Sequence, residues 1–452
     1  VASHLSQGEE LYRDLVDNKP PVIFYVYSLI FKCFGESEAA LRLFTAFFSL
    51  LTTFFIFLIG KELSDERLGV VSALLYAIFS GGMFVEGTGS NTEIFMALPL
   101  VLGLYCYLRE KPFLAGLFSG LAVMIKPVAL FNYLVLLAGG RAKWVKLVSG
   151  FLIVPLAFMV YFWLKGALAG FINCNLYYSL GMVNPNIVYF LIRTGYVFLF
   201  ENSVLWILAG LGAILIMVKL KEPRSRILLW WTVFSLFGVF SAGYAFGHYY
   251  IQAMPGLCLL GGIAVVRWKE FGFSKPITMS LWAIIAAFAL FIIANQYPFY
   301  LFYNGDQISV ERYGTPANVM ARDIGLKIKA RTKPDDRIFT KSLYSAMFYS
   351  GRDSLSRYYL TVRGGSGEVY FLGKKMYSHG FGIRRSAELL QAIETDFNLA
   401  LADIRTKYFI IYLKDYYAPP DLARKLVSYG YQPDRELSYP KEGVLVFKRS
   451  KQ

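Results

Sequence analysis

Apolar stretches separated by short polar connectors fill the first two thirds of the chain. A helix of about 20 apolar residues crosses a bilayer, and a shorter one can do so with local thinning or tilt. The pattern therefore predicts a polytopic α-helical membrane protein with about ten spans. We expect them at residues 39–60, 68–85, 94–108, 113–125, 128–138, 147–164, 203–220, 227–246, 250–266 and 277–297.

Composition agrees with a membrane protein and argues against a soluble one. Hydrophobic residues make up 56% of the chain and charged residues only 17%, with a mean hydropathy of +0.46, which is outside the usual range of soluble domains. The formal net charge is +15. The basic residues are dispersed among loops without an aromatic and basic stripe, so we expect no nucleic-acid partner. Positive-inside topology and anionic membrane lipids explain the charge better.

The basic residues also predict which loops face the cytoplasm. Fourteen of the twenty-one Lys and Arg before Asn304 lie in connectors that alternate along the chain, and such connectors stay cytoplasmic. They are residues 61–67, 109–112, 141–146, 219–226 and 267–275. The apolar segment Pro20–Gly35 is then expected to be an interfacial or re-entrant helix, which leaves residues 1–19 outside. The loops around Glu93, Lys126 and His248 share that outer face, as does the C-terminus.

Three regions follow: a partial first outer loop at 1–19, a transmembrane domain at 20–303 and an extracytoplasmic α/β domain at 304–452. The last of these carries 25 basic and 16 acidic residues. Strand patterns at 337–340, 358–362, 408–413 and 444–447 alternate with helical patterns at 321–330, 387–395 and 422–428, which is typical of a small α/β layer. The glycine-rich run at 364–367 predicts a flexible loop.

The first outer loop carries charges immediately before the membrane. Lys19 precedes Pro20 and Pro21, where an ammonium group can bind an anionic headgroup at the interface. Asp14 and Asp17 can orient Arg13 and Lys19, or accept a proton. The alternative is a solvated loop with proline at the start of a helix.

Two further loops offer charged groups. Glu93 is expected to be the only other carboxylate at this face in the first half of the chain, and it begins an apolar stretch. It is either a favourable charge in a first helical turn or a general acid or base. Lys126 stands at a turn before Pro127, where it either extends to the interface or makes a second phosphate contact.

His248 and Tyr249 stand on the outer face, immediately before the predicted span at 250–266. An interfacial aromatic belt explains the tyrosine, and His248 is a further candidate for the site. With three histidines and no neighbouring cysteine or histidine, a zinc site is not expected. We expect no cofactor, although a divalent metal stays open. The four cysteines lack metal or disulfide spacing and are expected to be core residues.

Four segments occur in an order that resembles a known family. They are LYRDLVDNKPP, GTGSNTEIFM, AGLFSGLAVMIKPVAL and GHYYIQAMP. In this order they resemble the membrane glycosyltransferases of the C-type fold, in particular the bacterial branch of the dolichyl-phosphate-mannose protein mannosyltransferases, related to the aminoarabinose transferase acting on lipid A. The similarity covers about residues 1–300.

The resemblance implies a hexosyl or pentosyl transferase in a bacterial plasma membrane, acting on its outer face. It would move a sugar from a polyprenyl-phosphate donor to a hydroxyl or amine of a protein, lipid or glycan. Lys19 matches the family lysine before Pro-Pro, Glu93 the acidic position of the second loop, and Tyr249 a tyrosine near the donor phosphate. Cations would hold the departing phosphate, and a first-loop carboxylate would deprotonate the acceptor.

One departure from the family concerns that carboxylate. The family's Asp-Glu pair would fall a few residues before Val1, so we expect the chain to lack the first span and the principal base, with Asp14 or Asp17 as substitutes. A transporter or flippase of a lipid-linked substrate is the alternative function. Lys126 beside Pro127 favours it, whereas the near absence of charge within the spans favours the transferase.

Overall fold

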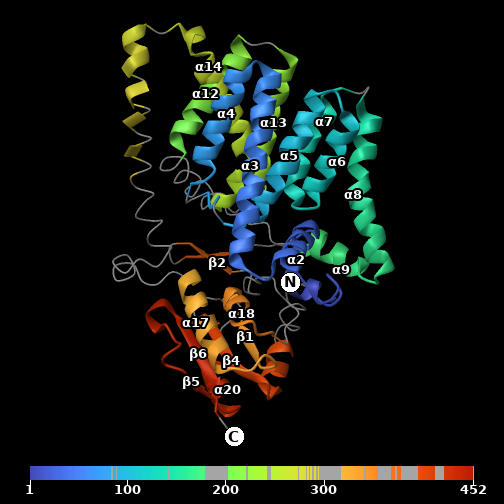
Figure 1. Cartoon of the computed structure of the whole chain (residues 1–452), viewed down its shortest axis with the longest axis vertical. Helices are drawn as coiled ribbons and strands as arrows, with labels where there is room; N and C mark the ends of the chain where they lie inside the picture. The colour runs from blue at the N-terminus through green and yellow to red at the C-terminus, as the bar shows by residue number, and fades with distance from the viewer. Residues whose placement is uncertain are drawn as a thin grey trace. The chain divides into compact units, whose positions relative to one another are not determined.

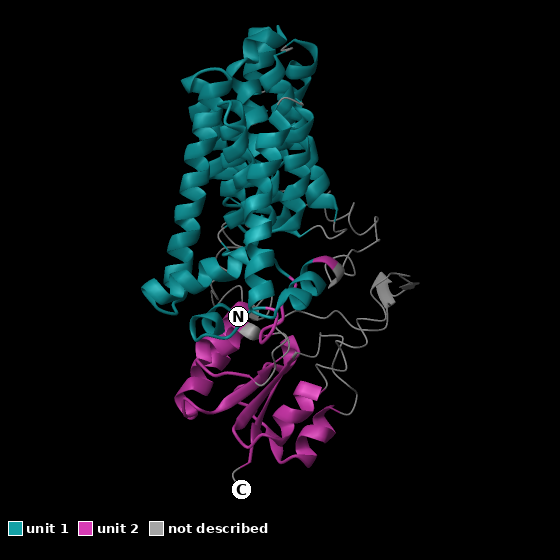
Figure 2. Ribbon diagram, turned by 90° about the vertical axis from the view of Figure 1, so that its right-hand side faces the viewer, with its two compact units in different colours: residues 1–11, 19–175, 182–296 teal, residues 12–18, 176–181, 297–452 magenta. Residues whose placement is uncertain are grey.

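The chain is described here as a computed structural model, and it forms two compact units (Figure 2). The first unit comprises Val1–Leu11, Lys19–Asn175 and Met182–Gln296, and the second comprises Tyr12–Asn18, Leu176–Gly181 and Tyr297–Gln452. The structure describes all residues except 83–84, 88, 141–142, 179–201, 220–221, 242–245, 273, 281, 285, 288–289, 292–293, 295–316, 341–342, 355–367, 372–373, 378–394, 413–421 and 451–452.

The first unit is helical (Figure 1). Its α-helices are α1 (Ala2–Ser6), α2 (Val22–Phe34), α3 (Glu38–Leu63), α4 (Glu66–Phe79), α5 (Thr92–Leu108), α6 (Pro112–Val123), α7 (Leu130–Ala138), α8 (Trp144–Leu164), α9 (Leu168–Ile172), α12 (Ser203–Val218), α13 (Pro223–Phe240) and α14 (Met254–Val266). Short 3₁₀ segments are η1 (Pro127–Ala129), η4 (Gly247–Gln252) and η5 (Trp268–Phe271), and η3 (Asn173–Tyr178) is a π-helical segment.

Two of the described helices, α3 and α8, are long and apolar enough to cross a membrane. The helices α2, α5, α6, α12 and α14 are apolar but shorter, as is the combined segment of η1 and α7. Each stretch predicted to span before residue 267 contains a helix, whereas residues 281, 285, 288–289, 292–293 and 295–297 of the last predicted stretch lie outside the described part. For the other predicted spans, the ten-span arrangement therefore stays a prediction.

Local sequence signals fix where several helices begin and how closely they pack. The side chains of Ser37 and Asp65 accept hydrogen bonds from the backbone N–H of the third residue of α3 and of α4, respectively, which stabilises both helix starts. A Cβ on Gly150 would overlap the carbonyl oxygen of Phe113, so α8 and α6 approach at backbone distance. Small residues allow such approach between apolar helices.

The second unit contains a four-stranded sheet with the order β1–β4–β6–β5. Its strands are β1 (Arg337–Thr340), β4 (Thr406–Tyr412), β6 (Val444–Arg449) and β5 (Tyr431–Pro433); β1 is parallel to β4, and the other neighbours are antiparallel. A separate antiparallel hairpin joins β2 (Glu368–Phe371) and β3 (Lys374–Tyr377). The structure thus confirms that the C-terminal region contains a β-sheet, as predicted.

Both faces of this sheet are buried, because successive strand residues point to opposite sides. On one side, Ile338 and Ile410 pack with residues of α17 (Ala317–Arg331) and α18 (Tyr344–Ser350). On the other, Phe339 and Phe409 pack with α20 (Leu422–Ser428) and Phe397. The sequence patterns missed α18 and β5. Residues 358–362, 364–367 and most of 387–395 lie outside the described part.

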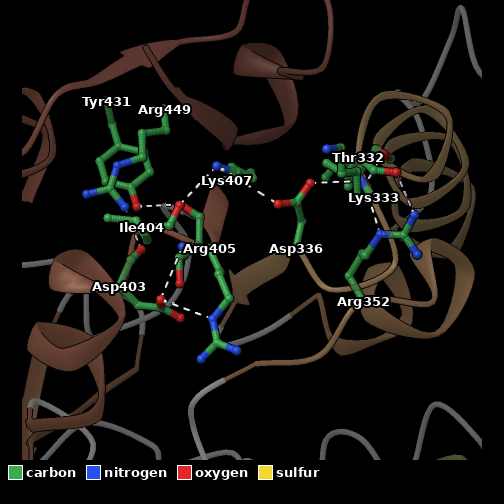
Figure 3. A network of polar contacts seen from close by, with 12 residues as sticks. Thr332, Lys333, Asp336, Arg352, Asp403, Ile404, Arg405, Lys407, Tyr431 and Arg449 are labelled. Carbon is green, nitrogen blue, oxygen red and sulfur yellow. Dashed lines mark hydrogen bonds and ion pairs between the residues drawn. The ribbon is translucent and has the colours of Figure 1, made fainter. Parts of the chain in front are cut away.

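Polar contacts tie the loops of the second unit together (Figure 3). The buried guanidinium of Arg352 donates to the hydroxyl and carbonyl oxygens of Thr332, at 2.9 and 2.8 Å, next to the end of α17. Burial alone would raise the pKa of Asp403, but hydrogen bonds from the Arg405 backbone and the Arg337 side chain outweigh it and hold this pKa below its usual range. These contacts satisfy buried polar groups and so serve the fold.

The cysteines are partly as expected. Cys106, Cys174 and Cys258 are buried, whereas Cys33 is exposed. The prediction of a core position was wrong for Cys33, because it lies in the last turn of α2 between Lys32 and Phe34, both of which are also exposed.

Candidate functional site

The loop before α5 brings a carboxylate into the interior of the first unit. Glu93 lies in the first turn of α5 and is 3% exposed. Ser90, three residues earlier, accepts a hydrogen bond from the Tyr27 hydroxyl on its carbonyl oxygen, and its own hydroxyl lies 2.8 Å from that of Thr45. Contacts from α2 and α3 therefore hold the loop that presents Glu93.

A lysine from another turn contacts this carboxylate directly. Lys126 lies between α6 and η1, and its Nζ forms an ion pair with Oε1 of Glu93. The same Nζ lies 3.6 Å from the centroid of the Tyr249 ring, in η4. An ammonium over an aromatic face is attracted by the ring's negative face. Three segments far apart in sequence thus meet around one cation.

The electrostatics of Lys126 are set by its surroundings. Its side chain is 21% exposed and that of Glu93 is 4% exposed. Burial lowers the pKa of the Lys126 ammonium, the Glu93 carboxylate acts in the opposite direction, and the positive charge of Lys19 lowers it further. Burial disfavours a charged form unless an opposite charge stands beside it. The interface extension expected as one alternative for Lys126 was therefore wrong: the ammonium is turned into the protein.

His248 connects Glu93 to a second carboxylate. Its Nδ1 lies 2.7 Å from Oε2 of Glu86, and its Nε2 lies 4.0 Å from Oε1 of Glu93. The imidazole also stacks on Phe246, with ring centroids 5.6 Å apart. A carboxylate that contacts one ring nitrogen of a histidine fixes the orientation of the imidazole ring. It also determines which of the two nitrogens carries the proton in the neutral form.

A buried polar network holds η4 in place. Gln252 donates from Nε2 to the carbonyl oxygen of Val128 at 3.1 Å and to Oδ1 of Asn132 at 2.8 Å. Asn132 in turn donates to the hydroxyl of Ser235 at 2.6 Å. These bonds link η4, the turn after Lys126, α7 and α13. Because a fully satisfied buried network is rigid, it fixes Tyr249 and His248 relative to Lys126.

Gly87 is required for the shape of the acidic loop. A Cβ at this position would overlap the backbone carbonyl oxygen of Ser80, and the preceding residue, Glu86, already has a φ of 55°. We therefore expect Gly87→Ala to displace Glu86 and Glu93 and to lower the midpoint of thermal unfolding by several degrees, since about 1 kcal/mol shifts it by about 2–4 °C in a domain of this size. Gly210→Ala is the matched control, because its Cβ would meet nothing within 4 Å. Equal midpoints for the two variants would contradict this account of the loop.

The other predicted site residues are placed as follows. Arg13 and Asp14 form an exposed ion pair of 2.8 Å, and Asp17 is 4% exposed. These three belong to the second unit, so their convergence with the Glu93 loop stays a prediction. Lys19 belongs to the first unit and is exposed.

Sequence reasoning missed two carboxylates. Glu93 was expected to be the only carboxylate near this site in the first half of the chain, apart from those of the first loop. This expectation was wrong, because Glu86 contacts His248. Its position next to the glycine-rich GTGSNTE run was the available signal. The second is Glu10, which is 7% exposed, accepts a hydrogen bond from the Tyr161 hydroxyl at 3.2 Å and lies 3.9 Å from Nζ of Lys165.

Among the described residues, no three His, Cys, Asp or Glu side chains are placed so that they could hold a metal ion. The described residues place a partly buried ammonium, that of Lys126, beside the Glu93 carboxylate, with Nε2 of His248 4.0 Å from the same carboxylate oxygen.

Solved structures define the class to which this fold corresponds. ArnT from Cupriavidus metallidurans in the apo state matches with a TM-score of 0.64 at 14% identity, over 100% of this chain and 93% of that one. The same protein bound to undecaprenyl phosphate matches with a TM-score of 0.61 at 16% identity, over 96% of this chain and 89% of that one. The chain therefore shares the fold of these ArnT structures, in agreement with the resemblance that its sequence motifs predicted.

The family comparison points in the same direction. Residues 18–164 match the family model described as dolichyl-phosphate-mannose-protein mannosyltransferase, which confirms the predicted resemblance and includes Glu93 and Lys126. An uncharacterized protein of Aquifex aeolicus (strain VF5) is 28% identical over 152 residues. That match spans 30% of this chain and 30% of the relative's length.

Proposed function

We propose that the protein transfers a sugar from a polyprenyl-phosphate donor to an acceptor at the outer face of a bacterial plasma membrane. The observation that carries this proposal is the Lys126 ammonium, held between the Glu93 carboxylate and the Tyr249 ring inside a C-type fold. The acceptor group is a hydroxyl or amine of a protein, lipid or glycan. The proposed arrangement keeps a first loop at 1–19, a membrane domain at 20–303 and an outer domain at 304–452.

The proposed donor site is built around the lipid phosphate. An incoming phosphate competes with Glu93 for the Lys126 ammonium, and Lys19 supplies a second positive charge nearby. During transfer, the bond between the anomeric carbon and the phosphate oxygen breaks, and its electrons remain on that oxygen. Fixed cations stabilise this developing charge. Arg13 is a further candidate for the same role.

The acceptor must lose a proton as its oxygen or nitrogen bonds to the anomeric carbon. Glu93 is a candidate base, because its carboxylate is buried beside the cation that binds the leaving phosphate. In the structure Glu93 is paired with Lys126, so it can accept a proton only after this ion pair opens. Asp14 and Asp17 remain candidates for the same proton transfer, which contributes on the order of 10²–10⁴ in rate.

A transporter of a lipid-linked substrate is the competing function. Such proteins place charged groups in broken helices near the middle of the bilayer. Here Glu93 lies in the first turn of α5, and Lys126 lies just after the end of α6. The pair therefore occupies the ends of the two helices, which supports chemistry at the membrane boundary.

Sugar transfer in proteoliposomes tests the proposal. The protein expressed from its complete gene is mixed with a panel of radiolabelled undecaprenyl-phosphate sugars and with membrane acceptors. We expect label to move from one donor into an acceptor fraction. Movement of intact labelled lipid between leaflets, without transfer from any donor, would overturn the transferase and establish the transporter.

A further inference from the structure

We propose that His248, held by Glu86, replaces Lys126 as the partner of Glu93 when a lipid phosphate binds, and that this exchange takes up a proton from solvent. The inference rests on the proposed function, because it requires an anionic lipid phosphate at Lys126. It assigns roles to Glu86 and His248 that phosphate binding alone does not require.

The exchange is suggested by a shared atom. Lys126 and His248 approach the same oxygen of Glu93, Oε1: Lys126 is in direct contact with it, and Nε2 of His248 lies 4.0 Å away. The His248 distance is longer than a hydrogen bond, and a shift of the Glu93 carboxylate toward the fixed imidazole, once Lys126 has moved, would close it. His248 therefore stands next to the oxygen that Lys126 would vacate.

Phosphate binding makes the exchange necessary. A phosphate that draws Lys126 toward itself leaves Glu93 with less compensating charge. Because the Glu93 side chain is only 4% exposed, water cannot fully replace the ammonium, and a buried carboxylate without a counter-ion is strongly disfavoured. The site must then supply another cation or protonate the carboxylate.

His248 is suited to supply that cation. In its neutral form, the imidazole donates its Nδ1 proton to Oε2 of Glu86, which lies 2.7 Å away, and Nε2 carries the free lone pair. A proton from water binds Nε2, and the new N–H points to Oε1 of Glu93. The product is an imidazolium between two carboxylates, so one proton is gained and no other bond changes.

The surroundings give this proton a route and set its electrostatics. Side-chain exposure falls from 47% for Glu86 to 21% for His248 and 4% for Glu93. Two carboxylates, Glu86 and Glu93, and the ammonium of Lys126, which shares the Glu93 oxygen, lie around the imidazole. Tyr249 packs edge-on against the ring with centroids 5.0 Å apart. Moving Lys126 toward a phosphate therefore leaves His248 beside two carboxylates without the ammonium that shares one of them.

Proton uptake on binding is the direct test. Undecaprenyl phosphate is titrated calorimetrically into the full-length protein at neutral pH, in buffers that differ in ionisation enthalpy. The difference in heat between buffers gives the number of protons taken up. We expect the wild type to take up as much as about one proton more than His248→Gln, and Glu86→Gln to show a reduced uptake. Because Glu86 is 47% exposed, that second variant preserves the fold.

A matched histidine provides the control. His4 also lies 2.8 Å from a glutamate, Glu9, and its side chain is 11% exposed, so His4→Gln should leave the proton uptake unchanged. Equal uptake by wild type, His248→Gln and Glu86→Gln, with binding retained, would overturn the exchange alone. Failure of the wild type to bind undecaprenyl phosphate would instead overturn the proposed function and the exchange with it.

Discussion

Replacing Lys126 by methionine is expected to reduce the rate of sugar transfer by about 10² to 10³, the size of effect seen when one stabilising group for a developing negative charge is removed. Methionine keeps the length of the side chain but removes the ammonium that contacts Glu93 and the Tyr249 ring. The rate is measured with the donor identified in the proteoliposome assay, at saturating acceptor.

Lys61→Met is the matched control for this variant. Lys61 is an exposed lysine in the last turn of α3, so its loss removes the same charge from the protein without touching the site. We expect this variant to retain the wild-type rate. A Lys126→Met protein that transfers as fast as Lys61→Met would remove Lys126 from the donor site. Lys126→Arg should retain part of the activity, since it keeps the charge but not the compact ammonium.

Glu93→Gln is expected to destabilise the protein by about 2–3 kcal/mol, because it leaves the Lys126 ammonium partly buried without its carboxylate. The value lies below that for a fully buried pair, since Lys126 is 21% exposed. Thermal unfolding in detergent measures the effect. The double variant Glu93→Gln with Lys126→Met should be less destabilised than the sum of the two single variants, since both charges are then absent.

Glu66→Gln controls for helix effects. Glu66 is also a glutamate in the first turn of an apolar helix, α4, but it is exposed. Its loss should cost only the few tenths of a kcal/mol that a first-turn carboxylate contributes at a surface. If Glu93→Gln and Glu66→Gln lowered the unfolding midpoint equally, Glu93 would be no more than a favourable helix-start charge, the simpler alternative that its sequence position allowed.

The sequence could predict single site residues but not their contacts. Glu93, Lys126 and Tyr249 stand out because each is a polar group at the end of an apolar stretch, where a charge is costly unless it has a role. Their meeting depends on how α5, α6 and η4 pack, and one sequence contains no information on that packing. Glu86 was missed for the same reason: its partner, His248, comes from the other end of the membrane region.

The sequence likewise predicted the presence of helices better than the residues at which they begin. The apolar stretch at 250–266 predicted a helix from its first residue, but the regular helix α14 begins at Met254, with Pro255 in its first turn. Proline is favoured at a helix start and disfavoured further inside, so the preceding residues form the 3₁₀ segment η4. That short segment carries His248 and Tyr249 and sets their orientation.

In the C-terminal region, the hydrophobic period and the length of each strand decided whether the sequence could predict it. The patterns for β1, β4 and β6 were recognised because their apolar residues face two buried sides of the sheet. β5 was missed, since it has only three residues and ends at Pro433, which is too short for a periodic signal. The buried contacts of Arg352 were equally hidden, because they go to backbone oxygens that no side-chain pattern reveals.

The affinity of undecaprenyl phosphate for wild type and Lys126→Met, measured in nanodiscs of the same lipid, tests the central claim most directly. That claim places the donor phosphate at the cation between Glu93 and Tyr249. A charge-assisted contact contributes about 1.5–3 kcal/mol, so the variant should bind about 10-fold to 100-fold more weakly, with Lys61→Met unchanged. Equal affinity of wild type and Lys126→Met would contradict the claim and place the phosphate elsewhere on the protein.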